Sequence, residues 1–330
     1  MFNETIIAEL GSVHDGSFGN AMKLVEVAAA CGADIAKFQT HIAEAETLAN
    51  APMPPYFKGE PRIDYFRRTA FSESQWRMLA NHARDLGIGF MSSPFSLEAV
   101  NLLEDVGVDC YKIASGEVTN IPLLKHIAKT RKPVLMSSGM SNWAELDRAM
   151  AALDGAAEVV VMQCTSAYPC PPDQIGLNVI GEMQRRYRVP VGFSDHTTGA
   201  AAAVAAAALG AVTIEKHLTF SRLMYGSDAA NAMEPDAFKS FAAGLREVWQ
   251  ALANPVDKGD VSRFGEMKLI FEKSIVTARA IGAGTRISEI DLAYKKPGDG
   301  IPAERYLDIV GKTVRRELPA NHKLTTEDFE

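Results

Sequence analysis

Several familiar signatures are missing from this sequence, and each absence narrows the choice of function. The four cysteines form no CxxC pair, and three of them lie in or beside apolar runs, so we expect buried free thiols. No GxxxxGK[ST] motif occurs, which excludes a P-loop nucleotide site. The net charge of −7 is spread without a basic block, so a nucleic-acid groove is not expected.

Long hydrophobic runs are also lacking. The longest alanine-rich stretch, residues 200–209, is too short to span a membrane and has a glycine on either side. The first residues do not resemble a signal peptide. We therefore expect a cytoplasmic protein with no membrane partner. With 330 residues, 47% hydrophobic and 23% charged, the chain has the composition of an ordinary globular protein and is long for one domain.

What the sequence does contain is a repeated alternation of strand-like and helix-like segments. Runs rich in apolar and β-branched residues each end in polar residues or glycine, and their nearly continuous hydrophobicity is typical of parallel strands buried on both faces. About eight such runs occur, the number needed for a closed (β/α)8 (TIM) barrel of the α/β class. They cover residues 6–11, 34–40, 88–93, 110–116, 133–139, 159–166, 191–196 and 211–217.

Helix-like patterns fill most of the intervals, and several end at a glycine, as expected for repeated βα units. Residues 43–70, rich in proline at their centre, break this rhythm. We interpret them as an extended loop over the barrel mouth that covers substrate, contacts another subunit or is a surface insertion. The expected helices cover residues 21–31, 74–86, 97–106, 142–153, 199–209 and 238–252.

The pattern changes beyond the barrel segments. Asn254-Pro255 indicates the start of a linker, and the sequence that follows it ends in short apolar runs and glycines. We predict a catalytic barrel over residues 1–255, a linker over 256–273 and a small β-rich domain over 274–330. A domain of this size needs to dock on a larger body to be very stable.

Polar side chains end every one of the predicted strands. One example is VPVGFSDHTTG at residues 189–199, where an apolar run is followed by a hydroxyl, a carboxylate and an imidazole. A turn with a helix cap would explain these polar residues as well as an active site would. In a barrel of this kind, the active site lies at the carboxyl ends of the strands. Because residues two apart share a face of a strand, Ser194 points with His196. Glu215 and His217 form a second such pair.

Two histidines at the tips of neighbouring strands predict a metal site. His196 and His217 can meet across one site, and imidazole with water and a carboxylate suits a divalent ion such as Mn²⁺, Zn²⁺ or Fe²⁺. Either histidine alone is more simply explained as a hydrogen-bonded residue at a strand end. It is the matched placement of the two that favours metal binding.

Two lysines lie inside apolar runs, where an unpaired ammonium group is expensive to desolvate. Lys37 and Lys112 either form ion pairs with Glu9 or Glu215, or both face a bound anion. Serine hydroxyls end strands around the same spot and supply neutral donors, so lysines and serines together predict a site for the phosphate of a small substrate. The serines are Ser93, Ser115, Ser137 and Ser194.

These strand-end motifs resemble those of the sialic acid synthase family, and the resemblance covers almost the whole chain. It implies a (β/α)8 barrel followed by a small C-terminal antifreeze-like (SAF) domain. It also implies an enzyme that condenses phosphoenolpyruvate with an open-chain hexose or N-acylhexosamine. The matching stretches include AELGSVHDGS (8–17), IAKFQTHI (35–42), YKIASGEVTN (111–120), GFSDHT (192–197), IEKHLT (214–219) and YKKPGDG (294–300).

The resemblance implies a division of roles within the site. The two lysines and the four serines would grip phosphoenolpyruvate. The two histidines would hold a divalent metal, typically Mn²⁺, with Mg²⁺ or another divalent ion as the alternative. Glu215 would act as general base or neutralise a lysine, and the two roles can coexist. The small domain would cover the barrel of a second protomer through its Lys296 turn, giving a domain-swapped homodimer.

The same resemblance does not determine which sugar is the acceptor. Gln39, Tyr168 and Glu215 would line its site, with Asp15 and Asp228 near it. Family members acting on N-acetylmannosamine have arginine where this chain has Lys296, and an ammonium group does not replace an arginine fork. Legionaminic, pseudaminic and neutral acceptors therefore stay open beside N-acetylmannosamine. The rival hypotheses are a metal-dependent barrel aldolase and a non-catalytic sugar-binding relative.

Overall fold

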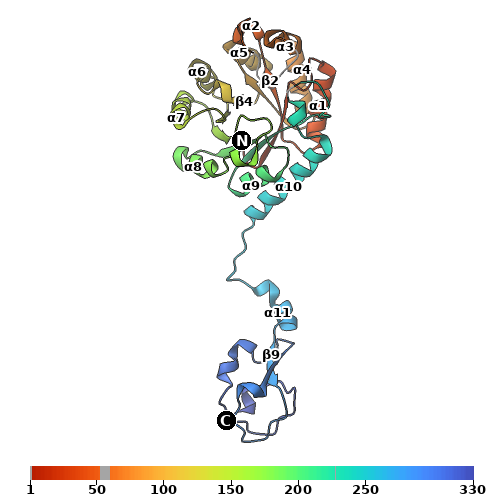
Figure 1. Cartoon of the computed structure of the whole chain (residues 1–330), viewed down its shortest axis with the longest axis vertical. Coiled ribbons are helices and arrows are strands. Elements are labelled where there is room, and N and C mark those ends of the chain that lie inside the picture. The colour runs from red at the N-terminus through yellow and green to blue at the C-terminus, as the bar shows by residue number, and fades with distance from the viewer. Residues whose placement is uncertain (1, 53–59, 227) are drawn as a thin grey trace. The chain divides into compact units, whose positions relative to one another are not determined.

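The computed structural model describes residues 2–52, 60–226 and 228–330. It divides into two compact units, Met1–Asn254 and Pro255–Glu330 (Figure 1). The first unit contains a closed parallel barrel in which the strands follow the order of the chain and β8 pairs with β1, which confirms the predicted TIM barrel. The strands are β1 (Thr5–Gly11), β2 (Ile35–Thr40), β3 (Gly89–Pro94), β4 (Cys110–Ile113), β5 (Val134–Ser137), β6 (Val159–Gln163), β7 (Val191–Asp195) and β8 (Thr213–His217).

The barrel interior is layered, and the layers follow from the alternation of side chains along each strand. Apolar side chains such as Ile35 and Cys110 are buried together in a cluster inside the barrel. The residue two positions further along each of these strands is a lysine, Lys37 on β2 and Lys112 on β4. The register that packs the apolar floor therefore carries both ammonium groups to the carboxyl end of the barrel.

Helices surround the strands and pack their apolar faces against the outside of the barrel (Figure 1). The helix expected from residue 74 begins earlier, because the side chain of Ser72 caps it by accepting from the backbone N–H of Gln75. The segments 121–129 and 178–187, which the pattern did not indicate, are helical too. The helices are α1 (Phe18–Ala30), α2 (Ala43–Glu46), α3 (Arg62–Thr69), α4 (Glu73–Asp85), α5 (Leu97–Val106), α6 (Ile121–Lys129), α7 (Trp143–Ala152), α8 (Asn178–Tyr187), α9 (Ala201–Ala208) and α10 (Pro235–Ala253).

The interpretation of residues 43–70 as one extended loop is corrected by the structure. The segment begins and ends with the helices α2 and α3, and its central residues 53–59 lie outside the described residues. Tyr65 and Phe66 on α3 are buried in a small cluster with Ala43 on α2. The two short helices therefore pack against each other instead of extending as a loop.

The C-terminal unit is small and β-rich. Its antiparallel sheet pairs β9 (Ser274–Thr277) with β10 (Leu292–Lys295), and isolated bridges join further short extended segments. A core of its own includes Ile275, Val314 and Leu324. Within the stretch 256–273, which the sequence indicated as a linker, lies the helix α11 (Gly265–Phe271).

Two of the absences noted in the sequence, of CxxC pairs and of long hydrophobic runs, can be compared with the structure. All four cysteines are buried free thiols, as expected. Among the described residues, no helix combines the length and the apolar character that crossing a membrane requires.

Asp328 is a buried carboxylate that joins several segments of the C-terminal unit through hydrogen bonds. Its carboxylate accepts hydrogen bonds from the guanidinium group of Arg316 at 2.8 Å and from the backbone N–H of Thr325 at 2.9 Å, and it lies 2.9 Å from Nε2 of His322. Burial would raise its pKa, but these three partners outweigh that effect and lower the pKa to about 2. The ionised carboxylate therefore stabilises the folded unit.

Replacing Asp328 by asparagine is expected to destabilise the C-terminal unit by about 1.5–3 kcal/mol at pH 7. Because the folded pKa is depressed, the stabilisation is complete above the unfolded pKa of about 3.9 and is lost as the pH falls through about 2. Hydrogen exchange of peptides from 274–330 in urea measures the difference, which should shrink by about half at pH 3. An equal difference at pH 7 and pH 3 would contradict this account.

Candidate active site

A cavity of about 340 Å³ opens at the carboxyl ends of the barrel strands. Side chains from all parts of the barrel sequence, from β1 to β8, converge on it, as expected for a (β/α)8 barrel. Most of the residues singled out in the sequence lie in its wall. These are Lys37, Gln39, Ser93, Lys112, Ser115, Ser137, Tyr168, Ser194, His196, Glu215, His217 and Asp228.

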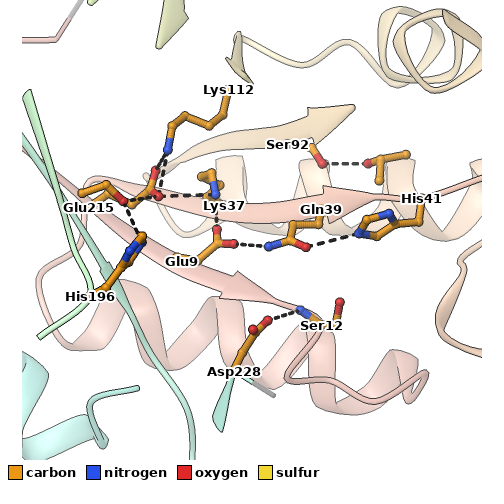
Figure 2. A network of polar contacts seen from close by, with 12 residues as sticks. Glu9, Ser12, Lys37, Gln39, His41, Ser92, Lys112, His196, Glu215 and Asp228 are labelled. Atoms are coloured by element: carbon orange, nitrogen blue, oxygen red, sulfur yellow. Dashed lines mark hydrogen bonds and ion pairs between the residues drawn. The ribbon is translucent and has the colours of Figure 1, made fainter. Parts of the chain in front are cut away.

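Buried ion pairs dominate the floor of this cavity (Figure 2). Lys112 Nζ lies 2.7 and 2.8 Å from the two carboxylate oxygens of Glu215. Lys37 is hydrogen-bonded to Glu9, and its Nζ is 3.6 Å from Glu215. Ser194 donates a hydrogen bond of 3.0 Å to the same Glu215 carboxylate. Both lysines thus form the ion pairs that the sequence left open, while facing the cavity.

Glu215 is an ionised carboxylate in this setting. Burial would raise its pKa, but the charges of Lys112 and Lys37 and the hydrogen bonds from Lys112 and Ser194 hold it well below its usual range. Burial would lower the pKa of Lys37, yet the attraction of Glu215 and Glu9 raises it. Two ammonium groups and two carboxylates therefore balance each other in a place from which water is largely excluded.

The two histidines lie side by side at the same end of the barrel. Their ring centroids are 5.8 Å apart. His196 Nδ1 lies 2.8 Å from the backbone carbonyl oxygen of Thr165, so it donates there, and the Nε2 atom keeps its lone pair. Burial, followed by the neighbouring His217, lowers the pKa of His196 to about 3, so this ring is neutral.

This pair fits a divalent metal ion. Among the described residues, the buried Nδ1 atom of His217 has no hydrogen-bond partner, and the lone pair of His196 Nε2 faces Ser194 and Tyr168 only at 3.4 Å. Imidazole nitrogen atoms placed in this way are ligands of the kind that Mn²⁺ or Zn²⁺ accepts. Over the described residues, no group of three or more His, Cys, Asp or Glu is arranged to hold a metal. The protein would then supply two ligands and leave the remaining positions to water and substrate.

The stretch that ends β7 combines both explanations raised by its sequence. His196 faces the cavity, whereas Asp195 points to the opposite side of the strand, where its carboxylate lies 2.8 Å from Nζ of the buried Lys216. The same ammonium group donates to the carbonyl oxygens of Thr197 at 2.5 Å and Gly199 at 2.9 Å. Asp195 and Lys216 therefore fix the turn, and the turn holds the histidine.

Asp15, which the sequence also singled out, does not line the cavity. The Asp15 carboxylate lies 2.7 Å from Nη1 of Arg68 on α3, so it joins the β1–α1 connection to that helix. Lys296 belongs to the C-terminal unit, where its Nζ atom lies 4.7 Å from the ring centroid of Phe271.

Other residues line the cavity although the sequence did not point to them as site residues. Glu9 was considered only as an ion-pair partner for a lysine, yet its carboxylate is part of the cavity wall. His41, Arg62, Phe66 and Phe95 reach the wall from beyond β2, from α3 and from beyond β3. The one available signal was the position of His41 two residues after Gln39, because it continues the face that carries Lys37 and Gln39.

A closed barrel that gathers buried lysines, carboxylates and imidazoles at the carboxyl ends of its strands is the arrangement of a (β/α)8-barrel enzyme. Comparison with known proteins narrows this class. The NeuB family profile matches residues 24–257, and the SAF domain profile matches residues 272–330. The chain belongs to the NeuB family.

Named relatives agree with this assignment. The chain is 36% identical to the N,N'-diacetyllegionaminic acid synthase of Campylobacter jejuni over 93% of this chain and 94% of that protein. It is 33% identical to the human N-acetylneuraminate-9-phosphate synthase over 96% and 93% of the two chains. A crystal structure of the N-acetylneuraminic acid synthetase from Leptospira borgpetersenii superposes with a TM-score of 0.72 at 27% identity, covering 79% of this chain and 89% of that one. The protein is therefore an enzyme whose relatives are nonulosonic acid synthases.

Proposed function

We propose that this enzyme condenses phosphoenolpyruvate with an open-chain hexose or N-acylhexosamine to give a nine-carbon 2-keto-3-deoxy acid and inorganic phosphate. In this reaction, C3 of phosphoenolpyruvate forms a bond to the aldehyde carbon of the sugar. Water then adds to C2, and the C2–O bond to the phosphate breaks. The single observation that carries the proposal is the pairing of Lys37 and Lys112 with Glu9 and Glu215 beside two imidazoles in one cavity.

The lysines and serines account for the binding of the enol phosphate. Its phosphate and carboxylate compete with Glu9 and Glu215 for the ammonium groups of Lys37 and Lys112, which are already held at the cavity wall. Charge-assisted hydrogen bonds of this kind are stronger than neutral ones. The hydroxyl groups of the serines around the lysines add donors without adding charge. The same ammonium groups stabilise the phosphate as it leaves.

The histidines account for the activation of the acceptor. A divalent ion such as Mn²⁺ held by His196 and His217 would supply Lewis-acid polarisation of the aldehyde oxygen. The hydrogen bond of His196 to Thr165 keeps its Nε2 atom unprotonated for this purpose.

Glu215 is the proposed general base for the water that adds at C2. Its carboxylate is ionised, lies at the centre of the cavity floor and contacts both lysines. When phosphoenolpyruvate draws the ammonium groups toward its own charges, Glu215 loses part of its stabilisation and becomes a stronger proton acceptor. The ion pair and the catalytic role are therefore successive states of one carboxylate.

The sugar contacts are assigned to the outer part of the cavity. Gln39, Tyr168 and Asp228 line it and offer an amide, a phenol and a carboxylate for the hydroxyl groups of an open-chain sugar. Lys296 of the C-terminal unit is proposed to complete the site in the assembled enzyme. Relatives named for legionaminic, neuraminic and pseudaminic acids are all similar to this chain, so the acceptor is the variable to test.

The proposal is tested by incubating the protein with phosphoenolpyruvate, Mn²⁺ and a panel of hexoses and N-acylhexosamines while phosphate release is recorded. Release should require both substrates, occur with one class of acceptor and stop on chelation. The product should carry the mass of the acceptor plus that of pyruvate. Phosphate release without an acceptor, or no release with any sugar, would refute the proposal.

A homodimer is the proposed assembly. The helix α11 carries Met267, Leu269 and Ile270, and none of these apolar residues belongs to the hydrophobic core of the described C-terminal unit. We expect this helix to bury them against a second copy of the chain. Light scattering should therefore give twice the chain mass of 35.7 kDa. Ile270→Lys should shift the mass toward that of a monomer, and a monomeric wild-type protein at micromolar concentration would contradict the assembly.

A further inference from the structure

His41 lies in the cavity wall and contacts residues of β2, α2, α3 and the segment after β3. It follows β2 directly, and its Nδ1 atom lies 2.8 Å from a carboxylate oxygen of Glu46 on α2. Its Nε2 atom lies 3.2 Å from the amide oxygen of Gln39, and the amide nitrogen of Gln39 donates to Glu9 at 2.8 Å. Figure 2 shows this chain of contacts leading from His41 to the ion pairs at the cavity floor.

The donors and acceptors of this chain fit together in one way. Glu9 accepts from Lys37, so it is ionised and needs a donor, and the NH₂ group of Gln39 must face it. The carbonyl oxygen of Gln39 then faces His41, whose Nε2 atom has to donate. Its Nδ1 atom also faces an acceptor, the carboxylate of Glu46. Both ring nitrogens of His41 therefore carry a proton, and the ring is an imidazolium.

The surroundings of the ring suit a cation. The imidazole of His41 is stacked between Phe66 on α3, at 3.8 Å between ring centroids, and Phe95 after β3, at 4.2 Å. The two interplanar angles are 13° and 14°, so the ring lies flat between two aromatic faces. A cation over an aromatic face is attracted to it. The side chains of His41 and Glu46 are 7% and 5% exposed, so their ion pair is only weakly screened.

We propose that His41 is a positioning residue that, as an imidazolium, holds the Gln39 amide in the orientation that forms hydrogen bonds with the acceptor sugar. This proposal rests on the synthase function proposed above. One N–H of Gln39 donates to Glu9, and one lone pair of its carbonyl oxygen accepts from His41. One N–H and one lone pair are left for hydroxyl groups of a bound sugar. The aromatic stack at the same time fixes α3 against the end of β3.

Other charged groups act on the same ring. Glu117 interacts electrostatically with His41, Glu46 and Arg62, and burial, the largest effect, raises the pKa of Glu117. The buried His14 also interacts with His41. Glu46 is the one carboxylate in hydrogen-bond contact with His41 among the described residues, so its replacement addresses the protonation of the ring most directly.

The test compares His41→Phe with the wild-type enzyme. Phenylalanine keeps the aromatic stack but removes both N–H donors and leaves the buried Glu46 carboxylate without its partner, so the fold should persist with a lowered melting temperature. The KM for the sugar should rise by about tenfold, while the KM for phosphoenolpyruvate should change less than twofold.

Two matched variants show whether the effect of His41→Phe comes from the ion pair with Glu46 and from the position of the histidine at the cavity. Glu46→Gln keeps a hydrogen-bond acceptor at Nδ1 but removes its charge, so it should raise the sugar KM less than His41→Phe at neutral pH. His126→Phe replaces a histidine on α6 that pairs with Asn101 and does not line the cavity, and it should leave all kinetic constants unchanged. Equal rises of both KM values in His41→Phe would overturn the proposal.

Nuclear magnetic resonance of ¹⁵N-histidine-labelled enzyme tests the same proposal without a measurement of turnover. Near neutral pH, the His41 ring should show a proton on both nitrogens, and these signals should vanish in His41→Phe. A single neutral tautomer would overturn the assignment even in an active enzyme. If the wild type turns over no sugar while the doubly protonated ring is observed, the synthase function fails and the imidazolium stands.

Discussion

Glu215→Gln is expected to lower kcat by about 10²–10⁴-fold, the range typical of losing a positioned general base. The substitution keeps the size and the hydrogen-bonding shape of the side chain. It removes the negative charge that both lysines contact, at 2.7 Å from Lys112 and 3.6 Å from Lys37, and with it the acceptor for the proton of the attacking water. The KM for phosphoenolpyruvate should not rise, because the phosphate no longer competes with Glu215 for the ammonium groups.

The matched control is Glu9→Gln. It also removes one buried carboxylate from a lysine, Lys37, and leaves a comparable charge imbalance in the cavity. A general-base role for Glu215 requires that kcat fall at least about tenfold further in Glu215→Gln than in Glu9→Gln. Steady-state phosphate release, with circular dichroism as a check on folding, measures both. Equal losses in the two variants would mean that Glu215 acts only as a counterion.

The charge balance of the site explains why the ion pairs and substrate binding are compatible. A lysine buried without a partner would be costly, and a buried pair broken on one side is more costly still. Glu9 and Glu215 keep Lys37 and Lys112 charged and in place. An anionic substrate then takes the place of these carboxylates as the partner of the lysines, so no ammonium group is left without a negatively charged partner.

The barrel and its charged floor could be predicted because they depend on local patterns. The strand runs are apolar on both faces, and alternation puts Lys37 and Gln39, like Glu215 and His217, on one face without further information. The convergence of these residues follows from the closure of the barrel alone. This is why most of the residues singled out in the sequence line the same cavity.

The outer wall could not be predicted because it depends on contacts between distant segments. Phe66 reaches His41 from α3, in a stretch whose prolines suggested a loop, and Phe95 comes from beyond β3. No spacing rule relates these residues. Asp15 shows the converse, because its family resemblance placed it near the sugar, whereas its carboxylate pairs with Arg68 instead of lining the cavity.

His217→Ala is expected to abolish measurable turnover while leaving the barrel folded. The buried Nδ1 atom of His217 has no hydrogen-bond partner among the described residues, so its removal relieves an unsatisfied group and sacrifices no hydrogen bond there. The loss should appear first in metal binding, with the affinity for Mn²⁺ reduced at least about tenfold. Calorimetric titration with Mn²⁺ measures this without any substrate.

Turnover should fall by at least about 10²–10³-fold, since the acceptor aldehyde would no longer be polarised. His126→Ala, a histidine outside the cavity on α6, is the matched control and should bind Mn²⁺ like the wild type. The decisive comparison is between binding and rate. If His217→Ala loses turnover but binds Mn²⁺ with unchanged affinity, or if the wild type stays active after chelation, the ring of His217 acts on the substrate directly and the pairing with His196 is not a metal site.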